Sequence, residues 1–221
     1  MSARRGPAQD GPNLVGFQVN HRAMRSDTRR LAELLRAVAD GERGYDRRRA
    51  VPLGRYLRSL TAGIHHHHQA EDEVLWPVLA RRAGAEIDLR ELSDDHAALD
   101  PLLARVDELT DRFVAEPGDR TAAGRLAAAL TRLRDQLDEH IEEEERLLFP
   151  VIRRYVPTAD WQRVEQAVRK GSAFRFELPR MERHARPEEL AELHALAGPA
   201  LRVMLFLLRP GFRRREARVF G

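Results

Sequence analysis

The sequence contains no cysteine. This absence excludes disulfides, thiolate-bound zinc, iron–sulfur clusters held by the chain's own thiolates, and a thiol nucleophile. Any metal ion must therefore be bound by histidine nitrogens and carboxylate oxygens. Aromatic residues are also scarce, with three Tyr and two Trp among 221 residues, whereas Ala, Leu, Arg and Glu are frequent. This composition is typical of helices rather than strands.

The sequence also lacks an apolar run of the length that spans a membrane, and its first residues lack the apolar segment of a secretory signal. The longest apolar run, 200–208, is short and is interrupted by Arg202. We expect this run to pack against the outside of a helical bundle. These features predict a cytoplasmic protein that has no membrane partner.

Charge of one sign does not dominate, because the formal net charge is only +3. The arginines are scattered beside Glu and Asp, and no helix-turn-helix or aromatic-rich strand accompanies them. We therefore expect no nucleic-acid partner.

Apolar residues recur at helical spacing in four long segments separated by short breaks. Long helices joined by short loops pack antiparallel with their sequence neighbours. The sequence therefore predicts an all-α protein, an up-down-up-down four-helix bundle over 14–155 that follows a flexible N-terminus at 1–13. The expected helices are 14–38, 51–82, a segment that begins after Ser93 and ends at 116–118, and 120–154.

The remaining residues, 156–221, are predicted to form a C-terminal helical extension with a basic tail. A short helix is expected at 158–170, followed by a stretch of little periodicity at 171–187. A helix at 188–208 is expected to break at Gly198-Pro199, and the tail at 209–221 is expected to be irregular.

One pattern occurs in both the second and the fourth helical segment. A His lies ten residues before a Pro, and a Glu lies six residues before the same Pro. Because residues four apart share one face of a helix, each pair can direct two ligands at one point. The two copies are His67, Glu71 and Pro77, and His140, Glu144 and Pro150.

The register of the first copy has to be chosen, because residues 65–68 are four consecutive histidines. His68 and Asp72 also lie four residues apart. In the second copy, however, that register falls on Ile141, which cannot bind a metal ion. We therefore choose the register of His67 and expect His65, His66 and His68 to be flanking or solvated residues.

The first and third helical segments each contribute one further histidine, His21 and His96. The spacing is 75 residues from His21 to His96 and 73 residues from His67 to His140. At the rise of an α-helix, all four histidines should lie at one level, about 28 Å from the loops at one end of the bundle. Carboxylates in such a core need a cation to offset the cost of their burial. The predicted metal ligands are His21, His67, Glu71, His96, His140 and Glu144.

This donor set suits iron, manganese or zinc. The chain lacks the Glu-x-x-His pairs of the ferritin-like class. Two His-x-x-x-Glu pairs, two further histidines and the aromatic-Pro endings Trp76-Pro77 and Phe149-Pro150 instead resemble the hemerythrin-like, HHE cation-binding family over about 14–155. The resemblance implies two iron ions in an oxo- or hydroxo-bridged di-iron centre, with both Glu residues bridging. It also implies a small-molecule partner: oxygen, nitric oxide or peroxide.

The classical oxygen carriers of the family place a second histidine one turn after the third-helix histidine, where this chain has Asp100. Asp100 is either a further ligand or a local hydrogen-bond partner of its own turn. His184 and His194 lack a matching carboxylate and are expected at the surface. The expected roles are ligand sensing, storage or oxidative-stress handling. The alternatives are a peroxide-decomposing enzyme and a regulatory module with a structural metal site. No catalytic residue is predicted, and the chain is expected to be a monomer or a homodimer.

Overall fold

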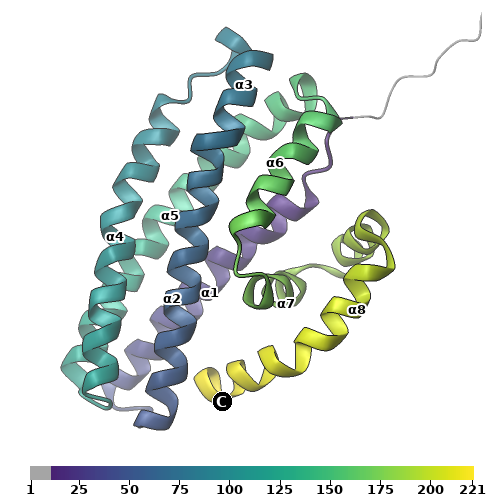
Figure 1. The fold of residues 1–221 in the computed structure, drawn as a ribbon. Coiled ribbons are helices and arrows are strands. Elements are labelled where there is room, and N and C mark those ends of the chain that lie inside the picture. The colour runs from purple at the N-terminus through teal and green to yellow at the C-terminus, as the bar shows by residue number, and fades with distance from the viewer. Residues whose placement is uncertain (1–10) are drawn as a thin grey trace, which may run out of the picture.

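The computed structural model describes residues 11–221, and every regular element among them is helical. The all-α prediction is confirmed for this part of the chain, whereas the up-down-up-down order stays a prediction. Most of the predicted flexible N-terminus, residues 1–10, lies outside the described residues. Figure 1 shows four long helices running together: α1 (Val15–Asp40), α2 (Arg47–Ala70), α4 (Arg90–Ala115) and α5 (Arg120–Tyr155).

The ends of these helices follow from local capping. α1 ends where Gly41 adopts a left-handed conformation with φ of 79°, which a glycine accommodates without strain. α2 begins four residues before the predicted Val51, because Asp46 caps it by accepting a hydrogen bond from the Arg49 backbone N–H at 3.1 Å. The breaks between the helices were therefore predicted more accurately than the first residue of each helix.

The second long helix changes its winding at the repeat. A π-helical turn, η1 (Glu71–Leu75), separates α2 from α3 (Trp76–Arg82), and a short 3-10 turn, η2 (Gly84–Glu86), follows. Single π-helical turns occur inside α-helices mostly at functional sites, because the wider turn changes the direction of the side chains on either side. Here the turn begins at Glu71, one of the predicted ligands.

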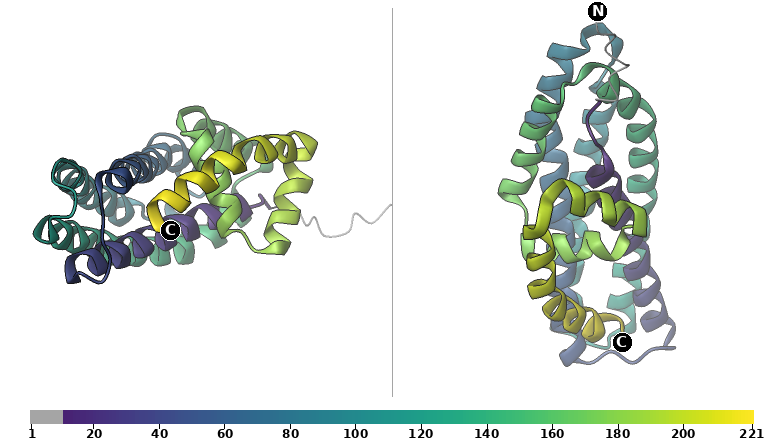
Figure 2. Two further views of the ribbon diagram at one scale, coloured as in Figure 1. Left: turned by 90° about the horizontal axis from the view of Figure 1, so that it is seen from below. Right: turned by 90° about the vertical axis from the view of Figure 1, so that its right-hand side faces the viewer.

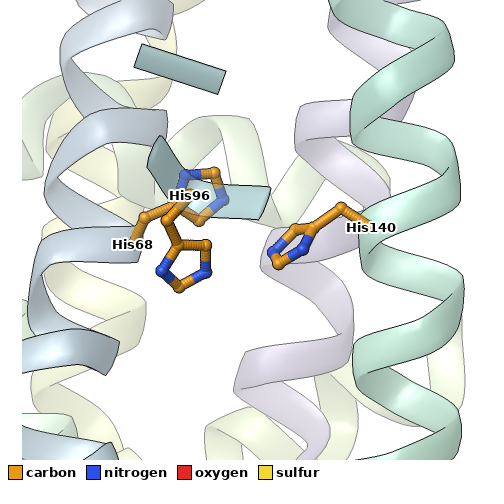
Figure 3. A group of neighbouring side chains, drawn as sticks. All are labelled: His68, His96 and His140. Atoms are coloured by element: carbon orange, nitrogen blue, oxygen red, sulfur yellow. The ribbon is translucent and has the colours of Figure 1, made fainter. Parts of the chain in front are cut away.

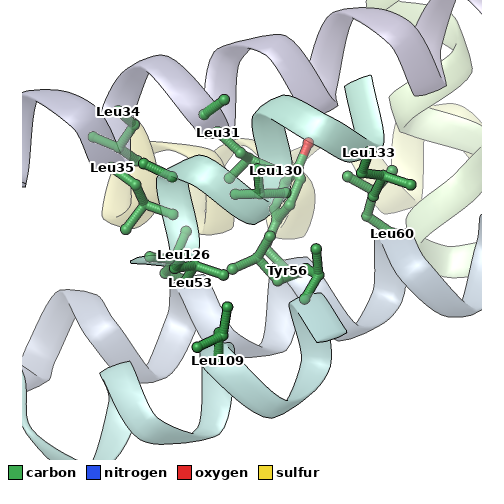
Figure 4. Packing of buried hydrophobic residues seen from close by; sticks show 14 of the residues in the cluster. Leu31, Leu34, Leu35, Leu53, Tyr56, Leu60, Leu109, Leu126, Leu130 and Leu133 are labelled. Atoms are coloured by element: carbon green, nitrogen blue, oxygen red, sulfur yellow. The ribbon is translucent and has the colours of Figure 1, made fainter. Parts of the chain in front are cut away.

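Two apolar clusters fill the bundle. The larger one gathers leucines of α1, α2, α4 and α5 around Tyr56 (Figure 4). The smaller one, at the other end, includes Leu75, Trp76 and Phe149. His67, Glu71 and Glu144 lie in sequence between residues of the larger and of the smaller cluster, so polar residues separate two apolar cores.

The C-terminal extension is more helical than the sequence indicated. It contains α6 (Thr158–Gly171), α7 (Phe174–His184) and α8 (Pro187–Phe220), and α7 and α8 lie across one side of the bundle (Figure 2). The predicted irregular stretch at 171–187 is wrong, because Phe176 and Arg180 of α7 are buried. The predicted irregular tail at 209–221 is wrong for the same reason, since α8 buries Phe212 and Val219. The predicted break at Gly198 is confirmed, with φ of 67°.

The prediction that the apolar run 200–208 packs against the outside of the bundle is confirmed for only some of its residues. Leu201 and Leu205 are buried, but the side chains of Val203 and Phe206 are 59% and 72% exposed. By length and composition alone, α8 also meets the criterion for a membrane span, a criterion that core helices of soluble proteins meet as well.

Phe212 gives a test of how firmly the extension docks. Its side chain is 6% exposed and packs in the larger apolar cluster. Phe212→Ala should lower the free energy of unfolding by about 3–5 kcal/mol, because a cavity replaces the ring. Phe206→Ala on the same helix is the matched control and should stay within about 0.5 kcal/mol of the wild type. Equal denaturation midpoints for the two variants in urea would contradict the observed docking.

Candidate metal centre

The predicted ligands meet in the interior as two adjoining groups. The first comprises His21, His67, Glu71 and Glu144, with one potential ligand atom of each within 4.8 Å of the others. The second comprises His96, His140 and His68, by the same criterion. Every one of these seven side chains is buried.

Short distances connect the first group. The Nε2 atoms of His21 and His67 lie 2.9 Å apart. Glu71 Oε1 lies 3.0 Å from His67 Nε2, and Glu144 Oε2 lies 3.4 Å from His21 Nε2. His67 lies in the last turn of α2, and Glu71 is the first residue of the π-helical turn η1 that follows it.

His68 belongs to the second group, which corrects the expectation that it is a flanking or solvated residue. It is 3% exposed, and its ring stacks on that of His96 at a centroid distance of 4.4 Å. The ring of His140 approaches both from α5, perpendicular to His68 at 5.1 Å (Figure 3). The choice of one register for both copies of the repeat concealed this role, because it assumed that each copy supplies the same residues.

Three histidines have a carboxylate close to the Nδ1 atom of the ring. His21 Nδ1 lies 2.9 Å from Glu145, His96 Nδ1 lies 2.9 Å from Asp72, and His140 Nδ1 lies 3.4 Å from Asp95. A carboxylate at Nδ1 holds the proton there and leaves Nε2 as a lone-pair donor directed inward, as in many metal sites. Sequence reasoning missed these three carboxylates, although each lies next in sequence to a predicted ligand: Asp72, Asp95 and Glu145.

His67 has a different partner, and it connects the centre to the extension. Asn20 lies 3.5 Å from His67 Nδ1 through its side-chain amide. Arg180 of α7 donates to the Asn20 Oδ1 atom at 2.9 Å and is 1% exposed. Arg180 also donates to Glu177 at 3.0 Å, which balances its buried charge.

The site fits a bound cation. Both oxygens of Glu71 and of Glu144, both ring nitrogens of His68, and Nε2 of His96 and of His140 are buried without a hydrogen-bond partner in the described part of the chain. Such orphaned polar atoms are rare in protein cores, and metal coordination satisfies them.

The protonation states of the buried histidines and carboxylates also fit a bound cation. Burial lowers the pKa of His67 to about 3 and that of His140 to about 4, so both rings are neutral, as a ligand requires. Burial raises the pKa of Glu71 and of Glu144 well above the ordinary value, and for Glu144 the neighbouring Glu71 adds to the rise. A cation between the carboxylates would remove this penalty.

The other candidate histidines and Asp100 lie elsewhere. Asp100 is exposed and lies 2.9 Å from His65, which is exposed too. His66 Nε2 donates to the Val168 carbonyl oxygen of α6 at 2.8 Å. His184 Nε2 lies 3.2 Å from Asp27, and both belong to the interface between α1 and the extension. Neither metal group includes these residues or His194.

The fold and this site together define a helical protein with a His- and carboxylate-rich metal centre. Comparison with known families agrees: residues 17–152 match the Hemerythrin HHE cation binding domain model. The match covers more than half of the chain, and the chain belongs to this family. Membership indicates a metal-binding site, typically for iron.

Two curated relatives are similar over the same region. The iron-sulfur cluster repair protein YtfE of Edwardsiella ictaluri (strain 93-146) is 26% identical over 139 residues, 62% of this chain and 61% of the relative. The protein of the same name from Escherichia coli O81 (strain ED1a) is 25% identical over 141 residues, with the same shares covered. The chain therefore spans less than two thirds of these relatives' length. No solved structure matches the chain.

The raised pKa of Glu144 predicts how the metal-free protein responds to pH. Because folding raises this pKa, the carboxyl's contribution to stability is intact below its unfolded value of about 4.3 and is lost as pH rises toward the folded value. Glu144→Gln removes this titration. The melting temperature of the metal-free variant, measured relative to the metal-free wild type, should therefore increase from pH 5 to pH 8. A difference that is constant across this range would contradict the prediction.

Proposed function

We propose that this protein binds two iron ions in a non-haem centre and uses them to bind a small ligand such as oxygen, nitric oxide or peroxide. His21 and His67 would hold one ion, and His68, His96 and His140 would hold the other. Glu71 and Glu144 would supply carboxylate oxygens to the pair.

The observation that carries the proposal is the position of Glu71. Its Oε1 atom lies 3.0 Å from His67 in the first group, and its Oε2 atom lies 3.6 Å from His96 in the second. Glu144 lies near both groups through a single oxygen, because its Oε2 atom lies 3.4 Å from His21 and 3.8 Å from His140. A carboxylate whose oxygens face two separate donor groups is suited to bridge two ions rather than to bind one.

The two groups differ in the number of histidines, two in the first and three in the second. If both carboxylates are shared, an ion at His21 and His67 would have one histidine fewer than its neighbour, so an external ligand is expected to bind there. The iron pair supplies reversible redox chemistry and open coordination positions. The protein's part is to keep the ring nitrogens fixed and to exclude water. Phe17 serves the second purpose, because its ring lies 4.5 Å from that of His21 and 5.2 Å from that of His67.

Sensing, storage or oxidative-stress handling is the role that we propose for this centre. A peroxide-decomposing enzyme remains the alternative within the same chemistry. A second candidate role is iron–sulfur cluster repair, which two relatives carry in their names. In that role this chain would supply iron from the same site, since it has no thiol of its own to hold a cluster.

Iron content and ligand binding test the proposal directly. Full-length protein loaded with ferrous iron under anaerobic conditions should hold two irons per chain, and adding nitric oxide or air should change the optical spectrum. Glu71→Ala and Glu144→Ala should each lose at least one iron, and with it most of the rise in melting temperature that iron causes. If both variants keep two irons, the bridging arrangement is wrong. Cluster repair is distinguished by iron transfer to a cluster-free acceptor protein, without a requirement for nitric oxide or oxygen.

The histidine run gives an independent test of the ligand set. His67→Ala and His68→Ala should each reduce the iron content by about one ion per chain, because the two rings serve different groups. His65→Ala is the matched control from the same run. Its side chain is 56% exposed, so the iron content should not change. If His68→Ala keeps its full iron content, His68 packs beside the site and is not a ligand.

A further inference from the structure

The outer face of α8 is the apolar part of the molecular surface. All four large hydrophobic side chains that stay mostly exposed in the described part of the chain lie on this helix. The inward face of the same helix is occupied, because Leu201, Leu205 and Phe212 are buried against the bundle and its extension. The exposed residues, with their exposed fractions, are Leu196 (60%), Val203 (59%), Phe206 (72%) and Leu207 (68%).

Positive charge predominates on the part of α8 after Gly198, whereas the part before it carries Glu188, Glu189 and Glu192. Four arginines of α8 are exposed, and none of them makes an ion pair within residues 11–221. The only carboxylate side chain after Gly198 is Glu216, which is 7% exposed and directed inward to Arg30 at 3.2 Å and to Arg183. The exposed, unpaired arginines are Arg202, Arg213, Arg214 and Arg218.

The basic surface continues from α8 onto the bundle. A groove of about 640 Å³ beside Arg218 is lined by Arg47, Arg48 and Arg55 of α2. These three side chains likewise form no ion pair in the described structure, whereas Arg58 one turn later pairs with Asp111. Unpaired arginines of α8 and α2 therefore follow the apolar stretch of α8 along the surface.

In contrast to the expectation from the sequence that the protein has no membrane partner, we propose that the outer face of α8 is a docking surface for an anionic lipid bilayer. The helix lies in the plane of the membrane surface, with Val203, Phe206 and Leu207 inserted at the boundary between headgroups and acyl chains. The neighbouring arginines contact lipid phosphates. Interfacial helices combine these two features, an apolar face that inserts and basic side chains beside it that bind anionic headgroups.

The charges favour a membrane over a second copy of the chain. If two copies paired through α8 in parallel, the arginines of one would lie against the same arginines of the other, which is repulsive. Whatever the direction of pairing, the stretch after Gly198 of a second copy offers no exposed carboxylate side chain to these arginines, because its Glu216 is only 7% exposed. An anionic lipid surface supplies both an apolar layer and the missing negative charge.

The inward face of α8 excludes a helix that crosses the bilayer. Glu216 and Arg30 form a partly buried ion pair between α8 and α1, and Tyr45 donates to the Val219 carbonyl oxygen at 3.1 Å. Crossing would break these contacts and would carry Glu216 into hydrocarbon. The helix can dock along the surface while the bundle keeps its fold.

Vesicle sedimentation of the full-length protein tests the proposal. The wild type should bind phosphatidylglycerol-containing vesicles at least tenfold more strongly than pure phosphatidylcholine vesicles, and the preference should weaken as salt is raised. The double variants F206A/L207A and R213Q/R214Q should each weaken binding at least fivefold. The matched control R36Q/R132Q removes two exposed arginines from α1 and α5 and should bind like the wild type.

Melting temperature and iron content serve as internal controls, because the substituted side chains are exposed and distant in sequence from the metal ligands. Both quantities should match those of the wild type in all three double variants. Equal binding to neutral and anionic vesicles, or none to either, would overturn the proposal. So would a dimer in sedimentation velocity that F206A/L207A abolishes, since a second copy would then be the occupant of the apolar face.

Discussion

The burial of Glu71 and Glu144 side by side is the constraint on which the structure depends. Two carboxyls in an apolar core, ringed by five imidazoles, carry a desolvation cost that no hydrogen bond in the described structure offsets. A bound cation would offset this cost and satisfy the orphaned nitrogens and oxygens together. The apolar clusters on both sides of this layer keep the four helices at the height that brings the donors together.

The sequence predicted the donor set well where the chemistry repeats. The His-x-x-x-Glu pairs and the equal heights of His21 and His96 bring the six chosen residues to one place, and the structure groups all six. His68 could not be found this way, because its counterpart in the second copy is Ile141. A helix that faces the bundle centre can direct two consecutive side chains to opposite sides of that centre, which a comparison of repeats does not reveal.

The reliance on apolar residues at helical spacing explains both why the four long helices could be predicted and why the prediction failed at α7 and at the end of α8. The four long helices carry wide apolar stripes, which are visible in sequence. In the tail, the inward residues are Phe212, Glu216 and Val219, and this i, i+4, i+7 pattern includes a carboxylate. Its helical character depends on the partners Arg30 and Arg183, which a count of apolar residues omits.

The histidines of the candidate centre differ in the group that their Nδ1 atoms face. His96, His140 and His21 each have a carboxylate at Nδ1, which makes the imidazole a stronger donor to a metal ion. His67 instead faces the neutral amide of Asn20.

Arg180 fixes the orientation of that amide, because a guanidinium can only donate and so holds the Asn20 oxygen toward itself. After burial, the positive charge of Arg180 is the largest influence that lowers the pKa of His67. Because Arg180 belongs to α7, the extension contributes to the surroundings of His67 as well as to the cover over the bundle.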